Sequence, residues 1–299
     1  MPRLLVTGAA GPAGRALLAA LVNRGVTAVG VDMAPGGCGP DGIESVPAAT
    51  DESFLPELLA VAARHRVDLI VPTVTEELPV LAPLAARANR PWVLVGTAEA
   101  VAIADDKWRT AQVLAGAGVA VPRSVLPGVL TAPALRGYLG TPYLSKPRHG
   151  RGGRGVRVHD GTEGPPPGSD DVLQEFVPGT EYAVDLFTDP HGRVEALVVL
   201  RKTTLARGRV GNGLRVTRDH CPDVADLARS AVRAIGLTGP ADLDIRRRRD
   251  GSPVVLEVNA RFGAHSGEAP EVLDALLDAR PGAGPGAGRV SPYRAGVAR

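Results

Sequence analysis

Residues 3–95 alternate short apolar runs with stretches of helical periodicity, and this alternation restricts the fold more than any other feature of the chain. Leu4–Val6 and Leu69–Val71 are apolar throughout, which is typical of strands covered on both faces. Parallel strands need long crossover connections, and amphipathic helices supply them. The sequence therefore predicts a parallel sheet with helices on both faces. The expected strands are Leu4–Val6, Val29–Asp32, Leu69–Val71 and Trp92–Val95, and the expected helices are Ala13–Arg24, Phe54–His65 and Leu78–Asn89.

A different pattern begins after residue 100. A helix is expected over Asp105–Gly116, and from Tyr143 onward alternating apolar residues and turn signals favour antiparallel strands. The chain is also too long for one small core, so we expect an α/β unit followed by an α+β domain. The expected divisions are a Rossmann-like unit at 1–100, an α+β domain at 101–280 with a small subdomain at about 119–173 and a larger one at about 174–280, and a disordered tail at 281–299.

Composition excludes several classes of function. The formal net charge is +2 and aromatic residues make up 3% of the chain, so no nucleic-acid partner is predicted. No apolar run approaches the roughly 20 residues that span a bilayer, so no membrane partner is predicted either. The first residues, MPRLLVTGAAG, are expected to start a strand and not a signal peptide. Two cysteines, Cys38 and Cys221, do not suggest a disulfide framework, and we expect a cytoplasmic protein.

Three glycines follow the first expected strand. Gly8, Gly11 and Gly14 precede the first expected helix, and Asp32 ends the second strand. This spacing is similar to a dinucleotide-binding fingerprint, in which glycines admit a pyrophosphate to a helix N-terminus and the acid binds a ribose. The same glycines also serve a tight turn and close packing of helix on strand. Both interpretations are open from the residues alone, and the first predicts an NAD(P)-dependent oxidoreductase.

Only three of the 34 basic residues are lysines, and these are Lys107, Lys146 and Lys202. Lysine offers a compact ammonium on a flexible stem, which suits a phosphate oxygen in a confined place. Lys146 ends an expected strand and precedes the loop PRHGRGGRG, in which Gly152 and Gly153 are adjacent. Glycines accept the backbone conformations that turn several N–H groups toward phosphate oxygens. The loop is therefore predicted to bind phosphates and to move as a lid.

Two later segments carry hydrogen-bonding groups and oxygen donors on expected strands. The backbone of Gln174–Val177 can pair with an adenine edge, and the Glu181 carboxylate can accept two ribose hydroxyls. Asp244 and Glu257 lie on strands joined by a hairpin that can bring them opposite each other, and Asn259 shares the face of Glu257. Buried carboxylates repel each other unless a cation lies between them. Two acids and an amide oxygen are ligands suited to Mg²⁺.

Taken in order, these motifs resemble the ATP-grasp superfamily, and within it the carboxylate–amine ligases of the carbamoyl-phosphate-synthase-like branch. The resemblance covers residues 105–263, and the unit at 1–100 is similar to the domain that precedes the ATP-grasp domain in that family. It implies two α+β subdomains that clasp ATP. It also implies a ligase that uses ATP with Mg²⁺ or Mn²⁺, activates a small amino-acid-like carboxylate as an acyl phosphate, and joins it to an amine. The reaction can link two molecules or close a ring, and specialised metabolism is the expected setting.

The resemblance implies a role for each matching residue, and it implies that the N-terminal glycines do not bind a dinucleotide. Asp244 departs from the family pattern, in which a longer Glu or Gln is more common. Either Arg201 or Lys202 is predicted to contact the substrate carboxylate or the transferred phosphoryl group, because alternation lets only one of them face the site. The implied contacts are Lys107 and Lys146 with the α- and β-phosphates, Gln174 and the backbone of Glu175, Phe176 and Val177 with adenine, Glu181 with ribose, Asp244, Glu257 and Asn259 with the metal, and Arg261 with the γ-phosphate and the acyl phosphate.

Three alternatives to the ligase are open from the sequence. A small-molecule kinase uses the same ATP residues and stops at a phosphorylated product. An oxidoreductase uses the N-terminal glycines, and an ATP-binding partner subunit has little turnover of its own. Two segments, 149–155 and 203–217, are expected to be mobile lids. The predicted partners are small-molecule carboxylates and amines, and a homodimer is one of the expected assemblies.

Overall fold

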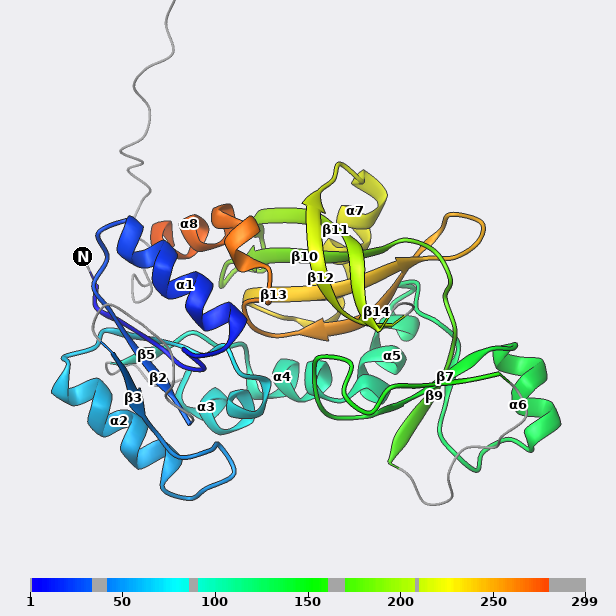
Figure 1. Cartoon of the computed structure of the whole chain (residues 1–299), viewed down its shortest axis with the longest axis horizontal. Coiled ribbons are helices and arrows are strands. Elements are labelled where there is room, and N and C mark those ends of the chain that lie inside the picture. Colours follow the sequence, from blue (N-terminus) through cyan, green and yellow to red (C-terminus); the bar gives the residue numbers. More distant parts are fainter. Residues whose placement is uncertain (1, 34–41, 86–90, 161–169, 208–209, 280–299) are drawn as a thin grey trace, which may run out of the picture.

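The computed structural model describes residues 2–33, 42–85, 91–160, 170–207 and 210–279. Three sheets organise this part of the chain (Figure 1). The tail that is expected to be disordered, 281–299, lies outside the described residues, as does the end of the helix expected to reach Asn89.

A five-stranded parallel sheet forms the N-terminal unit. Its elements are β1 (Leu4–Val6), α1 (Pro12–Asn23), β2 (Ala28–Asp32), β3 (Ile43–Ser45), α2 (Phe54–Arg64), β4 (Leu69–Val71), the 3-10 helix Thr75–Glu77, α3 (Leu78–Ala85) and β5 (Trp92–Val93). The strand order is β3-β2-β1-β4-β5, and every neighbouring pair is parallel. The apolar runs predict this arrangement, except that β3 is an additional short strand.

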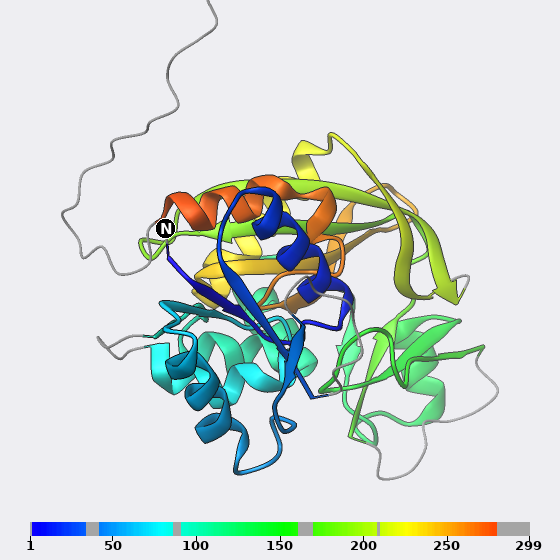
Figure 2. The ribbon, with the colours of Figure 1, turned by 60° about the vertical axis from the view of Figure 1, so that its left-hand side comes forward.

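The two faces of the parallel sheet are covered by different helices. Leu5 on β1 belongs to a core shared with α2 and α3, which includes Phe54 and Leu58. Successive side chains of a strand point to opposite faces of the sheet. Leu4 and the other side chains on the face opposite Leu5 therefore pack with α1 and with α8 (Pro270–Asp278). Figure 2 shows α1 and α8 side by side. An ion pair of 2.8 Å between Arg24 and Asp274 also joins these two helices.

A five-stranded antiparallel sheet forms the C-terminal unit. Its elements are β10 (Glu181–Thr188), β11 (Val194–Arg207), β12 (Val210–Arg218), α7 (Pro222–Ile235), β13 (Gly239–Arg247) and β14 (Pro253–Asn259). The strand order is β12-β11-β10-β13-β14. The helices α4 (Ala98–Asp105), α5 (Lys107–Gly116) and α7 pack in one core with inward residues of β10 and β13, such as Val184 and Leu243. The helix α8 covers the other face, where Ala183 and Leu200 are buried.

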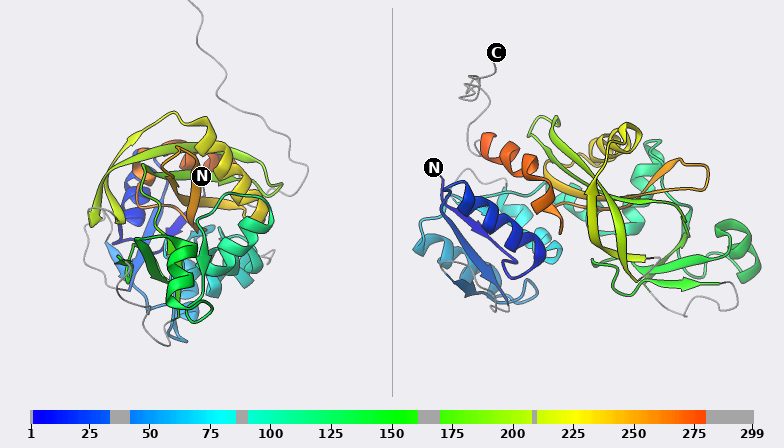
Figure 3. Two further views of the ribbon diagram at one scale, coloured as in Figure 1. Left: turned by 90° about the vertical axis from the view of Figure 1, so that its right-hand side faces the viewer. Right: turned by 45° about the horizontal axis from the view of Figure 1, so that its top comes forward.

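A small antiparallel sheet lies at the far end from the N-terminal unit (Figure 3). Its elements are β6 (Ser124–Val125), α6 (Ala132–Leu139), β7 (Tyr143–Pro147), β8 (Arg157–His159) and β9 (Asp171–Glu175). The strand order is β6-β9-β7-β8. The helix α6 packs on one face through Leu135 and Leu139, which contact Tyr143 and Leu173 of the sheet. This core is separate from the other cores of the described residues.

The helix expected over Asp105–Gly116 is present as α5 but begins at Lys107, because Asp106 is extended and its carboxylate accepts hydrogen bonds from the backbone N–H groups of Trp108 and Arg109. Aspartate is a preferred residue at this capping position. One expectation about secondary structure is wrong. The segment 203–217, expected to be a lid loop, belongs to the hairpin of β11 and β12, whose pairing contains several register shifts. Threonine and valine favour strands, and bulges allow the long hairpin to curve.

None of the helices in the described ranges combines the length and the apolar character needed to cross a membrane. The helix α7, for example, has 14 residues, whereas a span needs about 20.

Candidate active site

A cavity of about 610 Å³ lies where residues of all three sheets converge. Leu144, Val156 and Leu256 supply an apolar part, and the remaining lining is rich in charged groups. The residues predicted from the sequence that line this cavity are Lys146, Gly152, Gly153, Gln174, Glu181, Lys202, Asp244, Glu257, Asn259 and Arg261.

The strand β13 carries the central acid of the cavity. Asp244 lies opposite Glu257 on β14 and opposite Ala183 on β10. Counting from the turn would place Asp244 opposite Leu256, but the register shifts by one residue next to Asp244. Leu256 therefore has no partner in the ladder, as in a β-bulge. The shift brings the two carboxylates together, as the sequence predicts.

The ammonium of Lys202 lies between two carboxylates. Lys202 Nζ is 2.7 Å from Glu181 Oε1 and 2.6 Å from Asp244 Oδ1. Burial alone would lower the pKa of Lys202, but the two carboxylates outweigh burial and raise this pKa above its ordinary value. Burial raises the pKa of Glu181, and the Lys202 charge offsets part of that rise.

The other two lysines approach the same cavity from different sides. Lys107 Nζ is 3.1 Å from Glu257 Oε1 and donates to the backbone oxygen of Gly150 at 2.6 Å. Lys146 Nζ donates to the backbone oxygen of Leu256 at 3.0 Å, which is the carbonyl of the bulged residue. Burial lowers the pKa of Lys146 to about 8, with Glu257 opposing the shift and Lys107 adding to it. All three lysines of the chain therefore interact electrostatically with acids of the set Glu181, Asp244 and Glu257.

Arg261 is held by polar groups at the edge of β13 and β14. Its Nη1 donates to Asp242 Oδ2 at 3.1 Å and its Nη2 donates to Asn259 Oδ1 at 3.1 Å. Asp242 lies opposite Asn259 in the ladder, so one cross-strand pair fixes both oxygens. Burial and the neighbouring Asp244 charge raise the pKa of Asp242 to about 6, although Arg261 opposes the shift. The guanidinium is thereby oriented at the cavity wall.

The glycine loop after β7 is attached to the helices around it. Gly152 and Gly153 have φ values of 71° and 66°, which suit glycine, and both line the cavity. Arg148 Nη2 is 2.5 Å from Asp106 Oδ2, and Arg151 Nε is 2.8 Å from Glu76 Oε2. The loop therefore bridges the small sheet and the N-terminal unit, and Lys107 donates to its Gly150 backbone oxygen.

The N-terminal glycines take part in tight packing. A β-carbon on Gly14 would overlap the backbone oxygen of Gly8, and one on Gly8 would overlap Val74. The Asp32 carboxylate accepts a hydrogen bond of 2.9 Å from the backbone N–H of Ala10, which holds the glycine turn. These contacts favour the structural interpretation of the glycines over dinucleotide binding.

The sequence reasoning overlooked Glu76 and Glu77, which also line the cavity. Glu77 is buried and accepts a hydrogen bond from the Thr7 hydroxyl. Burial raises the pKa of Glu77 to about 8, and the nearby Asp32 and Glu76 charges add to the shift while Thr7 opposes it. A signal was present, because these acids follow β4 at the carboxyl edge of a parallel sheet, where α/β proteins bind ligands.

Five predicted residues are not part of the cavity lining, and one of them, Lys107, still contacts the lining residue Glu257. Arg201 points from β11 toward solvent, is half exposed and lies 3.5 Å from Asp219. Glu175 ends β9, and Phe176 and Val177 begin the connection from the small sheet to β10.

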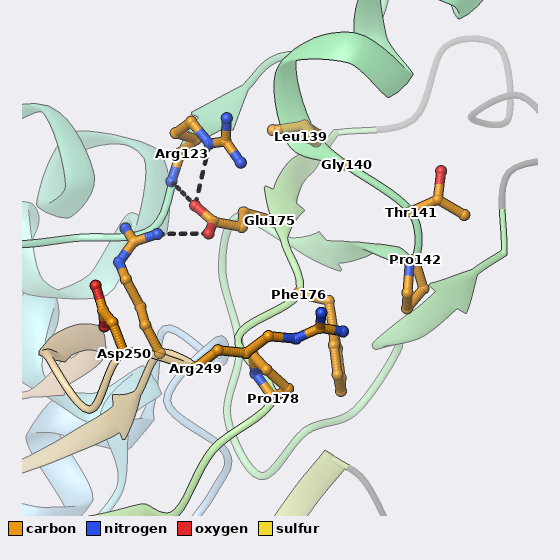
Figure 4. A pocket seen from close by; sticks show the side chains of 11 residues that line it. Arg123, Leu139, Gly140, Thr141, Pro142, Glu175, Phe176, Pro178, Arg249 and Asp250 are labelled. Atoms are coloured by element: carbon orange, nitrogen blue, oxygen red, sulfur yellow. Dashed lines mark hydrogen bonds and ion pairs between the residues drawn. The ribbon is translucent and has the colours of Figure 1, made fainter.

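The connecting segment borders a second cavity of about 450 Å³, which Figure 4 shows. Glu175 Oε2 is 3.2 Å from Arg123 Nε, and its Oε1 is 2.5 Å from Arg248 Nη1. Phe176 and Pro178 line the same cavity. The side chains of Glu175 and Phe176 therefore face the second cavity, and Val177 is buried.

The oxygen donors around Asp244 fit a hard divalent cation. Asp244, Glu257 and Asn259 lie on two paired strands, and carboxylate and amide oxygens are the ligands that Mg²⁺ prefers. In the described residues no cluster of three His, Cys, Asp or Glu side chains has the arrangement of a metal site. A metal here would therefore use the amide of Asn259 and substrate phosphates to complete its ligands.

A family model described as the ATP-grasp domain matches residues 104–265, more than half of the chain. The chain belongs to the ATP-grasp family. The match spans the lysines, the glycine loop and the acids of β13 and β14. The family and the fold predicted from the motifs are confirmed. A search of curated proteins found no match.

Solved structures share this fold at low sequence identity. An L-amino acid ligase from Bacillus licheniformis has a TM-score of 0.65 and 18% identity over 89% of this chain and 69% of its own. A biotin carboxylase from Campylobacter jejuni, solved as a complex with β,γ-ATP, has a TM-score of 0.64 and 18% identity over 91% of this chain and 71% of its own. An N5-carboxyaminoimidazole ribonucleotide synthetase from Thermotoga maritima has a TM-score of 0.63 and 21% identity over 87% of this chain and 69% of its own.

Proposed function

We propose that this ATP-grasp protein is an ADP-forming ligase that activates a small carboxylate as an acyl phosphate and joins it to an amine. The observation that carries the proposal is the convergence of Lys146, Lys202, Asp244, Glu257 and Arg261 on one cavity, with Lys107 paired to Glu257 at its wall. Such a set can neutralise a triphosphate and the charge that develops during phosphoryl transfer. The neighbouring folds named as an amino acid ligase and a synthetase support C–N bond formation.

The nucleotide would lie between the small sheet and the C-terminal sheet. Leu144, Val156 and Leu256 supply apolar contacts for a purine, and Gln174 lines the same region. The Glu181 carboxylate, which lies against Lys202 in the free protein, would accept ribose hydroxyls once Lys202 moves from it. Backbone N–H groups of the glycine loop would then lie over the phosphates.

Each charged residue would have its own role in phosphoryl transfer. Lys107 and Lys146 would bind α- and β-phosphate oxygens, and Arg261 would face the γ-phosphate and the acyl phosphate. Asp244, Glu257 and Asn259 would hold Mg²⁺ or Mn²⁺, which supplies neutralisation of phosphate charge when bound. Arg261 is presented in a fixed orientation because Asp242 and Asn259 bind both of its terminal nitrogens. A fixed cation needs no reorganisation when charge develops.

The reaction then proceeds in two balanced steps. A carboxylate oxygen attacks the γ-phosphorus in line, the bond to ADP breaks, and an acyl phosphate forms. An amine attacks the acyl carbon, the bond to the phosphate oxygen breaks, and amide and phosphate are released with the amine proton. The closed glycine loop keeps water from the acyl phosphate.

The cavity has room for substrates beyond the nucleotide. It continues past Arg261 to the N-terminal glycine turn and to residues 73–77. The wall there contains both Arg151 and acids such as Glu76 and Asp32, so it offers complementary charge to a molecule with a carboxylate and an ammonium. We infer small amino acids or similar compounds as substrates, joined to each other or closed into a ring.

The test is release of ADP from ATP and Mg²⁺ across a panel of amino acids, singly and in pairs, with and without hydroxylamine. The expected result is ADP release that depends on a carboxylate, with a hydroxamate formed when hydroxylamine is the amine. Lys146→Ala should abolish it, and Arg229→Ala, an exposed change on α7, should not. A stable phosphorylated product that is never consumed by an amine would establish a kinase and contradict the ligase.

A further inference from the structure

Lys202 neutralises two carboxylates that the proposed ATP site assigns to other partners. Its ammonium contacts Glu181 at 2.7 Å and Asp244 at 2.6 Å, and its side chain is 4% exposed. In the proposed function Glu181 receives the ribose and Asp244 receives the metal. Both acids are therefore already paired in the free protein by one lysine from a third strand.

Glu257, the second carboxylate of the proposed metal site, is also paired with a lysine. Glu257 lies 3.1 Å from the ammonium of Lys107. Each carboxylate that is proposed to bind the metal thus has a lysine partner in the absence of nucleotide. Buried acids that face each other need such cations, because their charges are otherwise uncompensated.

A metal ion and the Lys202 ammonium compete for the Asp244 carboxylate. Lys202 contacts Oδ1, and Mg²⁺ would need a carboxylate oxygen at about 2.0–2.1 Å in a nearly octahedral arrangement. Two cations held on one carboxylate also repel each other strongly in a partly buried site. Metal binding at Asp244 is therefore expected to displace Lys202.

We propose that Lys202 is a displaceable counter-cation, which blocks the metal position at Asp244 until ATP arrives with its metal and then moves to a phosphoryl oxygen. This inference rests on the proposed function of the site. It makes metal binding dependent on nucleotide, because only the phosphates offer the lysine a new partner. Lys202 is then a positioning residue for the metal as well as a phosphate ligand.

The cavity itself is the open volume beside Lys202, because Lys202, Gly213 and His265 all line it. A β-carbon on Gly213 of β12 would lie 3.1 Å from the Lys202 Cγ and 3.1 Å from His265 Nε2. The absence of a side chain at Gly213 therefore makes room for the lysine stem at the cavity wall. The stem is flexible, and its ammonium would turn into the cavity.

The experiment is a titration of the full-length protein with Mn²⁺ in the absence of nucleotide, followed by the electron paramagnetic resonance of free Mn²⁺. Lys202→Met keeps the length of the stem and removes the charge. The variant is expected to bind Mn²⁺ at least about tenfold more tightly than the wild-type protein, because Asp244 is released. With ADP present, the wild-type protein is expected to gain Mn²⁺ affinity, and the variant is expected to gain much less.

Two controls and one replacement variant complete the experiment. Arg201→Met, on the solvent side of the same strand, should match the wild-type titration. Adding Asp244→Asn to Lys202→Met should remove the gained affinity, and a gain that persists would overturn the proposal. If circular dichroism shows that Lys202→Met does not fold, the double variant Lys202→Met with Glu181→Gln is used in its place. The double variant leaves only one of the two acids without a compensating charge.

The outcomes separate this inference from the function on which it rests. A folded Lys202→Met protein that binds Mn²⁺ no more tightly than the wild type overturns the counter-cation role. If the wild-type protein nevertheless binds Mn²⁺ together with ADP, the proposed ATP site stands. If no variant binds Mn²⁺ with or without ADP, the proposed function fails as well.

Discussion

The buried carboxyl of Glu77 should make the stability of the protein depend on pH in a way that one substitution removes. Glu77 is 7% exposed, and burial raises its pKa from 4.5 to about 8. In the unfolded chain the group ionises near its ordinary pKa. Between pH 4.5 and pH 8 the unfolded state therefore loses a proton that the folded state keeps, and the free energy of unfolding falls as pH rises.

The size of the effect follows from the shift. One pKa unit corresponds to about 1.4 kcal/mol, so the cost of Glu77 grows by about 4 kcal/mol between pH 5 and pH 9. Glu77→Gln keeps an oxygen that can accept from the Thr7 hydroxyl and cannot ionise. Its free energy of unfolding relative to the wild type should therefore rise by about 4 kcal/mol over the same range.

The assay is urea unfolding followed by circular dichroism at pH 5, 7 and 9 for both proteins. Glu52→Gln, an exposed carboxyl change in the same unit, is the control and should follow the wild type at every pH. A difference between Glu77→Gln and the wild type that stays constant from pH 5 to pH 9 would refute the reasoning, because it would show that Glu77 ionises alike in both states.

Other substitutions test separate parts of the structure. Gly14→Ala should lower stability by more than about 2 kcal/mol in thermal unfolding, because its β-carbon meets backbone, whereas Gly116→Ala, with open space around it, should change stability by less than about 1 kcal/mol. Asp106→Ala should cost about 1–2 kcal/mol as a lost helix cap, and it should also speed proteolysis of the glycine loop, because Arg148 loses its partner; unchanged proteolysis would contradict that link. Arg261→Lys should lower kcat about 100-fold and leave the Kd for ATP within about threefold, measured by calorimetry, because a single ammonium cannot keep both contacts of the guanidinium; an equal loss in both would show a role in ground-state binding.

The sequence was sufficient for features that depend on local pattern. The apolar runs such as Leu4–Val6 and Leu69–Val71 predicted the parallel sheet, because strands covered on both faces have few alternatives. Period-two alternation predicted that Arg201 and Lys202 could not both face the site, and the structure places only Lys202 there. The sequence alone could not tell which of the two residues points into the cavity, because arginine and lysine are equally compatible with the end of a strand.

Features that depend on tertiary contacts were beyond the sequence. The sequence predicted that Asp244 would lie opposite Glu257, but it did not predict the bulge at Leu256 that sets this register, because bulges leave little local signal. The Leu256 carbonyl then accepts a hydrogen bond from the Lys146 ammonium, and these two residues are 110 positions apart in the sequence. Glu77 was missed because a charged residue after a strand is usually solvated, and its burial depends on packing that the local sequence does not report.

The sharpest test of the central claim follows an oxygen atom from the substrate to the phosphate. A carboxylate substrate found in the amino acid panel would be labelled with ¹⁸O in both carboxyl oxygens, and the phosphate released during turnover with the amine would be analysed by mass spectrometry. An acyl phosphate predicts that each phosphate carries one ¹⁸O atom, because the attacking carboxylate oxygen leaves with the phosphoryl group. Phosphate without label, released together with amide, would contradict the mechanism, since the carboxylate would then never have been phosphorylated.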